Sequence, residues 1–263
     1  MKYCILSRDF EESNKIKEYI KLNLKHEYNN NNPDIVIAIG GDGTIIKAAH
    51  EYPKAILFGI HTGHLGFYAN YLVNDVDLLI NDINNNNYNI EEYSLLQAEF
   101  VSKNGTVTND FALNEVTISS PLRTLTLDVY IDDHFLEKYR GTGLCISTPS
   151  GSTAYNKSLH GAIVDNLVNV IQLTEIAGIN SNAYRTISSP MVLSDKRRIK
   201  LEVEAKTYQE TSDLFITADH VSYPVKELKT LYIFLSDKKL KMASHDKKNF
   251  MDRITRTFLV SKE

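Results

Sequence analysis

The stretch DIVIAIGGDGTIIKAAHEY, Asp34 to Tyr52, constrains the fold more than any other part of the chain. It begins as an unbroken apolar run, is interrupted by Gly-Gly-Asp-Gly-Thr, and continues with apolar residues at helical spacing. A strand that is apolar at every position is typical of a parallel sheet covered on both faces. Glycines between such a strand and a helix let the backbone approach an anion, and the first N–H groups of the helix point at it. The stretch therefore predicts a phosphate-binding turn in an α/β domain, with Thr44 helping to cap the helix.

The remaining pattern divides the chain into two domains. Strands and amphipathic helices alternate up to the tract NNNNY, Asn84 to Tyr88, which marks a boundary. Beyond it, short segments of alternating polarity predict a mostly β domain, interrupted by one helix over Asn166 to Ile176. The end of the chain returns to helical spacing and is expected to dock onto the first domain. We therefore predict an α/β domain over 1–92, completed by a C-terminal helix over 245–263, and a β-rich domain over 93–244.

Composition limits the partners of this chain of 263 residues. Its net charge is −4 with an isoelectric point near 6.1, so no basic field favours nucleic acid or an acidic membrane. No apolar run approaches the roughly 20 residues that span a bilayer, and the N-terminus does not resemble a secretory signal. Cys4 and Cys145 lie in strand-like apolar context and are expected to be buried free thiols. These features indicate a soluble cytoplasmic protein.

The glycine-rich turn matches neither of the two commonest nucleotide-binding motifs. No Gly-x-x-x-x-Gly-Lys-Ser/Thr string occurs, and Ile46 stands where Gly-x-Gly-x-x-Gly requires its last glycine. The turn differs from both in carrying Asp42, whose carboxylate would repel bound phosphates. One explanation is that Asp42 deprotonates or orients a hydroxyl that attacks a phosphoryl group. The other is that it only accepts hydrogen bonds from turn amides. The turn alone does not decide between them.

A second stretch, RGTGLCISTPSGSTAYNKSL from Arg140 to Leu159, is dense in glycines and small hydroxyl side chains. Such side chains suit a ribose and a pyrophosphate, and Tyr155 offers an aromatic face. A polar hairpin loop is the alternative interpretation. A covalent serine nucleophile is not indicated, because Gly-x-Ser-x-Gly is absent and no histidine is evidently paired with a serine.

With both stretches, the chain resembles the NAD kinases, in particular the Gram-positive bacterial branch. The matching pieces occur in the family's order: GGDGT (Gly40 to Thr44), HTGHLGFYA (His61 to Ala69), LNE (Leu113 to Glu115), STPSGSTAYNKSL (Ser147 to Leu159) and RTISSP (Arg185 to Pro190). GGDGT alone is only moderately specific, because diacylglycerol and sphingosine kinases carry it. The Ser-Thr-Tyr motif is highly specific.

The resemblance implies a phosphotransferase that makes NADP⁺ from NAD⁺ at the 2′-hydroxyl of the adenosine ribose. It implies ATP as donor, with Mg²⁺ or Mn²⁺ carried by the ATP. It also implies a Rossmann-like α/β nucleotide-binding domain followed by a β-sandwich-like domain. The assembly would be a homodimer or homotetramer, whose site lies between the two domains and borrows residues from a neighbouring subunit. Neither nucleic acid nor membrane is an expected partner.

Roles carry over from the family by position. Asp42 resembles the general base and a ribose contact, and no residue is assigned as a metal ligand. The Asp219-His220 pair resembles a family Asp-His near the ligand. The residues expected to bind NAD are Asp42, Gly43, Asn114, Glu115, Arg140, Thr142, Ser150, Thr153, Ala154, Tyr155, Ser158, Ala177 and His220.

The chain departs from the family at two positions. Thr142 replaces an aspartate, which removes a polar contact to NAD, and His160 replaces a common glycine. Two other functions are alternatives: a lipid kinase that shares the Gly-Gly-Asp-Gly-Thr loop, and a dinucleotide-binding module without catalysis.

Overall fold

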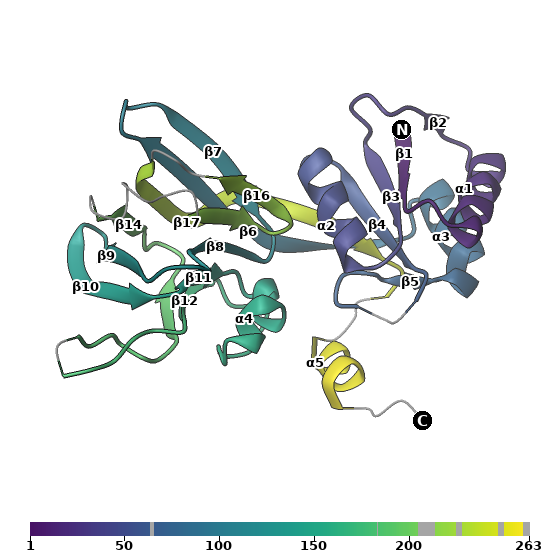
Figure 1. Cartoon of the computed structure of the whole chain (residues 1–263). Helices are drawn as coiled ribbons and strands as arrows, with labels where there is room; N and C mark the ends of the chain where they lie inside the picture. The colour runs from purple at the N-terminus through teal and green to yellow at the C-terminus, as the bar shows by residue number, and fades with distance from the viewer. Residues whose placement is uncertain (64–65, 183, 205–213, 225–227, 247–249, 260–263) are drawn as a thin grey trace. The chain divides into compact units, whose positions relative to one another are not determined.

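The computed structural model describes residues 1–63, 66–182, 184–204, 214–224, 228–246 and 250–259. The chain forms two compact units, Met1–Tyr93 with Leu240–Glu263, and Ser94–Lys239. It leaves the first unit along β6 (Asn89–Ser102) and returns along β17 (Leu228–Ser244), as Figure 1 shows. Residues 240–244, which we expected in the β-rich domain, lie in the first unit instead, because β17 runs on without a break and Lys241 pairs with Ile56.

A parallel sheet forms the centre of the first unit. Its strands are β1 (Lys2–Ser7), β2 (Glu27–Tyr28), β3 (Ile35–Ile39), β4 (Ile56–His61) and β5 (Tyr71–Leu72). They lie in the order β2-β1-β3-β4, and β5 pairs with β4 beyond them. Every residue of β3 is buried, as its apolar sequence predicts.

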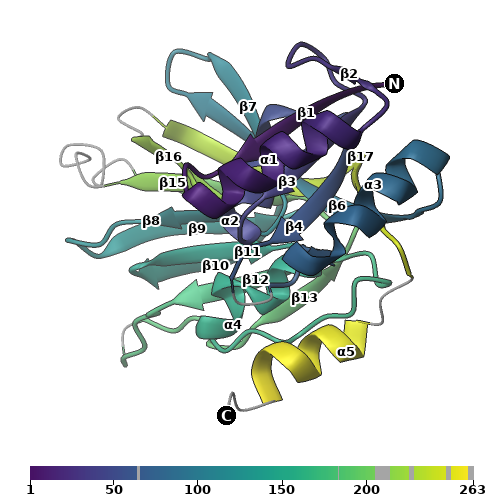
Figure 2. The same cartoon turned by 90° about the vertical axis from the view of Figure 1, so that its right-hand side faces the viewer.

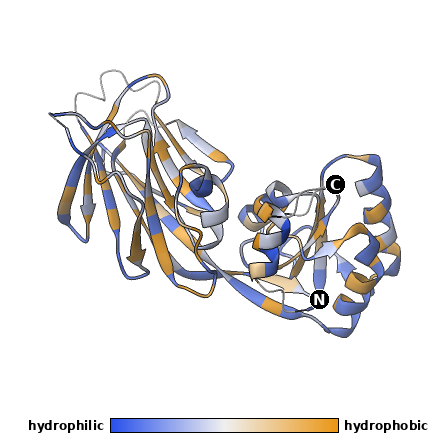
Figure 3. Cartoon of the chain, turned by 90° about the horizontal axis from the view of Figure 1, so that it is seen from below, coloured by the Kyte–Doolittle hydropathy of each residue, from blue (hydrophilic) through white to orange (hydrophobic). Residues whose placement is uncertain are grey.

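Helices cover both faces of this sheet. The helices α1 (Glu11–Asn23) and α3 (Val76–Asn85) lie on one face, and α2 (Asp42–Glu51) lies on the other (Figure 1). A short 3₁₀ turn, η1 (Val73–Asp75), precedes α3. Hydrophobic and hydrophilic residues alternate along the helices, as Figure 3 shows. Ile16, Ile20, Leu79 and Ile83 of α1 and α3 pack into one core with the sheet. The predicted α/β domain is confirmed.

The second unit is a sandwich of two antiparallel sheets. One sheet runs β10-β9-β14-β17, with β6 on β17 and β7 on β6, and the other runs β13-β12-β11-β8-β15-β16. Side chains from both sheets, including Val116, Leu127, Ile146 and Leu201, share one core. The new strands are β7 (Val107–Ala112), β8 (Glu115–Ser119), β9 (Leu125–Ile131), β10 (His134–Gly141), β11 (Gly143–Ser147), β12 (Val170–Ile176), β13 (Met191–Ser194), β14 (Ile199–Val203), β15 (Phe215–Ala218) and β16 (Val221–Pro224).

The helix predicted over Asn166 to Ile176 is wrong, because that segment ends in strand β12. Its polar residues mimic the solvent face of a helix, yet Gln172 and Thr174 are buried. Both can be buried because the polar group of each side chain has a hydrogen-bond partner. Gln172 Nε2 donates to the Ala162 carbonyl at 3.0 Å, and Thr174 Oγ1 donates to Asn156 Oδ1 at 2.6 Å. The acceptors lie in or next to α4 (Tyr155–Ser158), which follows the 3₁₀ turn η2 (Ser150–Thr153).

The C-terminal helix is shorter than predicted within the described residues. It comprises α5 (Phe250–Ile254) and a π-helical turn, Thr255–Leu259, whereas 247–249 and 260–263 lie outside the described residues. Both cysteines are buried and free, as predicted, and burial raises the pKa of each thiol. Among the described helices, none has the length and apolar character to cross a membrane.

Candidate functional site

The glycine-rich turn places Asp42 at the first position of α2. Gly40 has a φ of +155°, and a Cβ built there would lie 2.3 Å from Thr44 Oγ1, so the turn closes only with glycine. The N-cap of α2 is Gly41, which makes no side-chain cap. The expectation that Thr44 caps the helix is therefore wrong, because the helix has already begun two residues earlier. The buried Thr44 hydroxyl finds no hydrogen-bond partner in the described part of the chain.

The Asp42 carboxylate is held by a different loop, the one that follows β4. The backbone N–H of Phe67 donates to Oδ2 at 2.8 Å, and that of Tyr68 donates to Oδ1 at 3.1 Å. A Cβ built on Gly66 would lie 2.2 Å from Asp42 Oδ1, so this loop reaches the carboxylate because residue 66 is glycine. Each carboxylate oxygen can accept two hydrogen bonds, so each keeps a lone pair for a ligand. Residues 64 and 65 of the same motif lie outside the described residues.

Arg8 joins this corner of the first unit, and sequence reasoning missed it. Its Nη2 atom lies 3.6 Å from where a Cβ on Gly43 would stand. Arg8 follows β1, which pairs with β3, and the carboxyl ends of neighbouring parallel strands meet at one edge of a sheet. Its position after a buried strand was the signal that could have identified it. The N–H groups of Thr44 and Ile45 donate to the Gly41 carbonyl at 2.9 and 3.4 Å. Those of Asp42 and Gly43, at the start of α2, are therefore the ones that together with Arg8 favour an anion.

In the second unit, Asp219 fixes the backbone of the LNE segment. Its carboxylate accepts hydrogen bonds from the N–H groups of Leu113 at 2.7 Å, Asn114 at 2.7 Å and Glu115 at 3.2 Å. The Asp219 N–H donates in return to the Glu115 carbonyl at 3.0 Å. Asp219 has a φ of +52° in the turn between β15 and β16, and the adjacent His220 is exposed. The two residues of the predicted Asp-His pair therefore differ: Asp219 supports the backbone and His220 lies on the surface.

Glu115 is a buried carboxyl with an unusual protonation equilibrium. Burial and the negative charge of Asp219 raise its pKa to about 8, and a hydrogen bond from the Tyr155 backbone opposes the shift. Its Oε2 atom is buried without a hydrogen-bond partner among the described residues. An unpaired buried oxygen is costly and therefore well suited to a ligand hydroxyl.

The Ser-Thr-Tyr stretch packs its first turn against the same segment. Thr148 Oγ1 donates to the Leu113 carbonyl at 2.6 Å, and Ser150 Oγ donates to it at 3.2 Å. A Cβ on Gly151 would lie 2.0 Å from the Asn114 carbonyl oxygen, so glycine is required for this approach. Figure 2 shows α4, which follows this turn, beside strand β11.

The predicted residues of this stretch differ in exposure. Ser150 and Thr153 are buried, whereas Tyr155 is 43% exposed and Ser158 is exposed. Ala154 is partly buried between them. Exposure of the Tyr155 ring next to buried polar groups is the arrangement that stacking on a base requires.

Three other predicted residues lie at the opposite end of β11. Strand β11 pairs Ser147 with Glu115 at one end and Gly143 with Ser119 at the other, a separation of about 13 Å along the strand. At the Gly143 end, the Arg140 guanidinium lies 3.8 Å from the centre of the Tyr184 ring. The Thr142 N–H donates to the Ile176 carbonyl at 3.0 Å, and Ala177, the residue after Ile176, has a φ of +48°. The structure thus does not bring Arg140, Thr142 and Ala177 together with Asn114 and Glu115.

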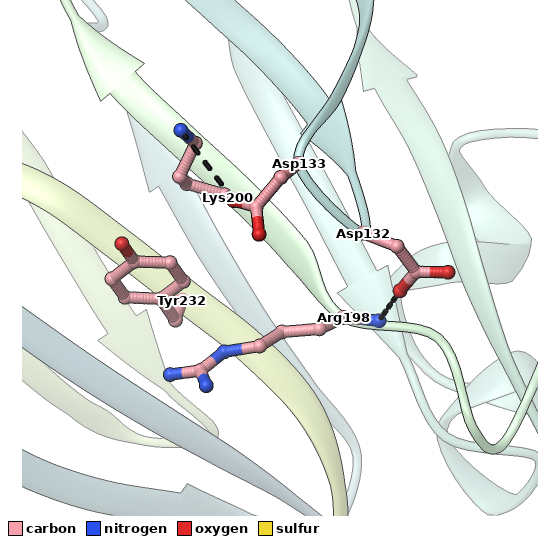
Figure 4. Close-up of a pocket in the computed structure, with 5 residues that line it drawn as sticks. All are labelled: Asp132, Asp133, Arg198, Lys200 and Tyr232. Carbon is pink, nitrogen blue, oxygen red and sulfur yellow. Dashed lines mark hydrogen bonds and ion pairs between the residues drawn. The ribbon is translucent and has the colours of Figure 1, made fainter.

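A separate pocket lies on the other sheet of the second unit. Asp132, Asp133, Arg198, Lys200 and Tyr232 line it (Figure 4). Its lysine is 3.7 Å from an Asp133 carboxylate oxygen, and the Arg198 N–H donates to Asp132 Oδ1 at 2.9 Å. None of the predicted site residues lines this pocket. Within the described residues, no three His, Cys, Asp or Glu side chains gather as a protein metal site.

Comparison with known proteins decides the family. A model of the ATP-NAD kinase N-terminal domain matches residues 7–88, and one of the ATP-NAD kinase C-terminal domain matches residues 113–244. The NAD kinases of Staphylococcus aureus strains JH9 and Newman are each 38% identical over 274 residues, covering 100% of this chain and 99% of theirs. The chain belongs to the NAD kinase family. The resemblance inferred from the motifs is therefore confirmed.

Solved structures of this family share the fold. A yeast NADH kinase complexed with NADH aligns with a TM-score of 0.82 at 18% identity, over 100% of this chain and 89% of its own. An NAD kinase from Archaeoglobus fulgidus in complex with ATP aligns with a TM-score of 0.75 at 20% identity, over 97% and 99%. The predicted two-domain fold of an NAD kinase, α/β followed by a β-rich domain, is confirmed.

The structure explains one of the two departures from the NAD kinase pattern. His160 has a φ of +60°, in the left-handed region that favours glycine, so the common glycine there has a conformational reason. The loop accepts histidine at some cost in strain, and His160 is exposed, so its ring does not crowd the core. Nothing in the structure explains why threonine stands at position 142.

Proposed function

We propose that this NAD kinase transfers the γ-phosphoryl group of ATP to the 2′-hydroxyl of the adenosine ribose of NAD⁺, with Asp42 as general base. One observation carries the proposal: the backbone N–H groups of Phe67 and Tyr68 fix the carboxylate of Asp42 at the start of α2, and Arg8 lies beside the next residue, Gly43. A carboxylate held at a phosphate-favouring helix start suits a hydroxyl that must lose a proton as it attacks phosphorus.

The proposed reaction is a direct displacement. Asp42 accepts the proton of the 2′-hydroxyl as its oxygen forms a bond to the γ-phosphorus. The bond from the γ-phosphorus to the bridging oxygen of ATP breaks, ADP leaves, and Asp42 later returns the proton to water. The Asp42 and Gly43 N–H groups at the start of α2 and the Arg8 guanidinium bind phosphate oxygens. Gly43 lets the substrate approach the helix start, because it carries no side chain.

The proposed NAD site uses the LNE segment and the Ser-Thr-Tyr stretch. Asn114 and Glu115 would bind the ribose hydroxyls, which supplies the partner that Glu115 Oε2 lacks. Tyr155 would stack on the adenine, with Ser150, Thr153, Ala154 and Ser158 lining the ribose and adenine pockets. His220, exposed beside Asp219, would contact the ligand from the β15–β16 turn.

A divalent cation would enter with ATP. No cluster of acidic or histidine side chains in the described residues would hold it alone. Mg²⁺ and Mn²⁺ prefer oxygen ligands, and Mg²⁺ usually keeps several waters. Phosphate oxygens of ATP and water molecules would therefore supply most of the ligands. When bound, the cation neutralises the charge that develops on the phosphates.

We also propose a homodimer or homotetramer. Arg140, Thr142 and Ala177 lie at the far end of β11 from Asn114 and Glu115, so in one protomer they do not line the same part of the site. A second chain that presents its Arg140 end to the first would place these residues near the dinucleotide. Sedimentation analysis at micromolar concentration tests this proposal, and a monomer that is fully active would contradict it.

The decisive experiment is an assay of NADP⁺ formation from NAD⁺, ATP and Mg²⁺, measured by enzymatic cycling. A diacylglycerol and sphingosine screen run in parallel tests the lipid-kinase alternative, and calorimetry with NAD⁺ tests the binding-module alternative. NADP⁺ formation by the folded protein supports the proposal. NAD⁺ binding without turnover, or phosphorylation of a lipid instead, would contradict it.

A further inference from the structure

The C-terminal segment, defined here as residues 250–259 of α5 and the π-helical turn, contacts the loop that holds Asp42. That loop, residues 66–70, is called the Asp42 loop below. The ring of Phe258 packs on the ring of Phe67 with centroids 5.3 Å apart and planes at 41°. Phe67 is also the residue whose N–H donates to Asp42 Oδ2 at 2.8 Å. The segment and the carboxylate therefore contact the same residue.

Arg253 makes a second connection between the segment and the Asp42 loop. Its side chain is buried, with 6% of its surface exposed. Nη2 donates to Asn70 Oδ1 at 3.2 Å and to Glu91 Oε2 at 2.8 Å. A buried guanidinium costs free energy unless its donors are paired, so these contacts hold the segment in one position. Asn70 in turn donates to the Ala243 carbonyl at 3.1 Å, which anchors the end of the loop to β17.

Tyr93 connects Arg253 to the Asp42 loop by a second route. Its hydroxyl accepts a hydrogen bond from Arg253 Nη1, and its ring meets the Tyr68 ring edge to face, with centroids 5.7 Å apart. Tyr68 is 3% exposed and donates its N–H to Asp42 Oδ1 at 3.1 Å. Both residues that bind the carboxylate are thus braced, Phe67 by Phe258 directly and Tyr68 by Arg253 through Tyr93.

We infer that Phe258 and Arg253 are positioning residues for Asp42, and that the C-terminal segment is required for turnover although it touches no substrate. This inference rests on the proposed role of Asp42 as general base. The segment lies outside both ranges that the family models match, 7–88 and 113–244. A displacement of a reacting group by about 1 Å can cost about 10²-fold in rate, so a loosened Asp42 loop should lower kcat.

The test compares Phe258→Ala with Leu259→Ala, its neighbour in the same π-helical turn. Leu259 is 74% exposed, so its truncation also removes a large apolar side chain from this turn but does not remove the contact with Phe67. We expect F258A to lower kcat by about tenfold or more, with the Kd for NAD⁺ changed less than twofold, and L259A to match the wild type. If Phe258 contributed only to folding, F258A would lower the thermal midpoint but would not lower kcat selectively over the Kd for NAD⁺.

A second readout does not depend on catalysis. Hydrogen exchange of the Phe67 and Tyr68 amides, followed by NMR, reports their bonds to Asp42 directly. Asp42→Ala, which removes the acceptor, gives the rate of the unbonded amides. Exchange in F258A should move toward that rate, whereas L259A should keep wild-type protection. The same shift is expected in Arg253→Lys, which keeps the charge but loses the planar fork of donors.

The outcomes separate this inference from the proposed function. Wild-type kcat and wild-type amide protection in F258A would overturn the inference. Suppose that F258A loses protection of the Phe67 and Tyr68 amides and that the wild type forms no NADP⁺. The contact of Phe258 with the Asp42 loop would then stand, and the proposed function would be refuted. Should F258A fail to fold, Phe258→Leu takes its place, and we expect a smaller loss of kcat and of amide protection. Wild-type kcat together with wild-type amide protection in that variant would overturn the inference.

Discussion

The Oδ1 atom of Asp219 lies 2.7 Å from the backbone nitrogen of Asn114, a residue 105 positions earlier in the chain. The same carboxylate accepts the amides of Leu113 and Glu115, so one side chain fixes the backbone of three consecutive residues. Two of those residues are proposed to bind the ribose of NAD. Asp219 thus supports the proposed dinucleotide site through the backbone of the LNE segment.

Replacing Asp219 should weaken NAD binding while leaving the chemical step largely intact. In Asp219→Ala the three amides lose a charged acceptor, and hydrogen bonds to charged groups are worth about 1.5–3 kcal/mol each. We expect the KM for NAD⁺ to rise at least about tenfold, with a smaller change in kcat. Steady-state kinetics measure this, with Asp237→Ala, an exposed aspartate of the same unit, as control. A larger fall in kcat than rise in KM would contradict the positioning role.

Glu115 should make stability depend on pH in a direction opposite to that of a salt-bridged acid. Its folded pKa is about 8 and the ordinary value is 4.5, so between these limits the unfolded chain releases a proton that the folded chain keeps. The contribution of Glu115 to stability therefore falls as pH rises through this window, by up to about 1.4 kcal/mol per pH unit, and is constant above it.

Glu115→Gln removes this titration. The difference in thermal midpoint between the variant and the wild type should therefore move in the variant's favour between about pH 5 and pH 8. Ligand-free protein in calorimetry or circular dichroism is sufficient for the measurement. Identical differences at the two pH values would show that the Glu115 carboxyl ionises normally.

Gly66→Ala should impair catalysis without unfolding the protein. The new Cβ would lie 2.2 Å from Asp42 Oδ1, so the carboxylate, which is the flexible end of a side chain, must move away. We expect a loss of kcat of about tenfold or more, with a thermal midpoint near that of the wild type. Gly63→Ala is the matched control, because its Cβ would meet only the His61 ring at an ordinary 3.8 Å. Equal kcat in the two variants would contradict the account of Asp42.

Arg8 should affect ATP rather than NAD⁺. Its guanidinium lies beside Gly43 at the start of α2, where the phosphates are proposed to bind. Arg8→Met should raise the KM for ATP about tenfold, because a charge-assisted bond to phosphate is lost, and should leave the KM for NAD⁺ unchanged. Lys54→Met removes an exposed cation elsewhere in the first unit and serves as control. A rise in the KM for NAD⁺ alone would place Arg8 outside the ATP site.

Sequence patterns predict much of the first unit because its signals are local. The apolar run over Ile35–Ile39 and the glycines before Asp42 depend on neighbouring residues, and both appear in the structure as expected. The segment Asn166 to Ile176 failed for the opposite reason. Its polar residues are buried through bonds to Ala162 and Asn156, and a periodicity argument treats every polar residue as exposed.

The candidate site divides in the same way. The positions of Asp42, Glu115 and Tyr155 could be proposed from motifs, because each motif is contiguous in the chain. The residues that hold them could not, since Phe67 is 25 positions from Asp42 and Asp219 is 104 from Glu115. Arg8 and Phe258 belong to no motif. Only the tertiary structure brings Arg8 to the start of α2 and Phe258 to the Asp42 loop.

Whether Asp42 removes the proton from the 2′-hydroxyl is measured by the rate of NADP⁺ formation in the variant Asp42→Asn. Asparagine keeps the size of the side chain and can accept one of the two backbone N–H groups, but its NH₂ group cannot accept the other, and it cannot act as a base. We expect kcat to fall by about 10²–10⁴-fold while calorimetry shows NAD⁺ binding close to that of the wild type. A variant that forms NADP⁺ at the wild-type rate would show that Asp42 is not the base.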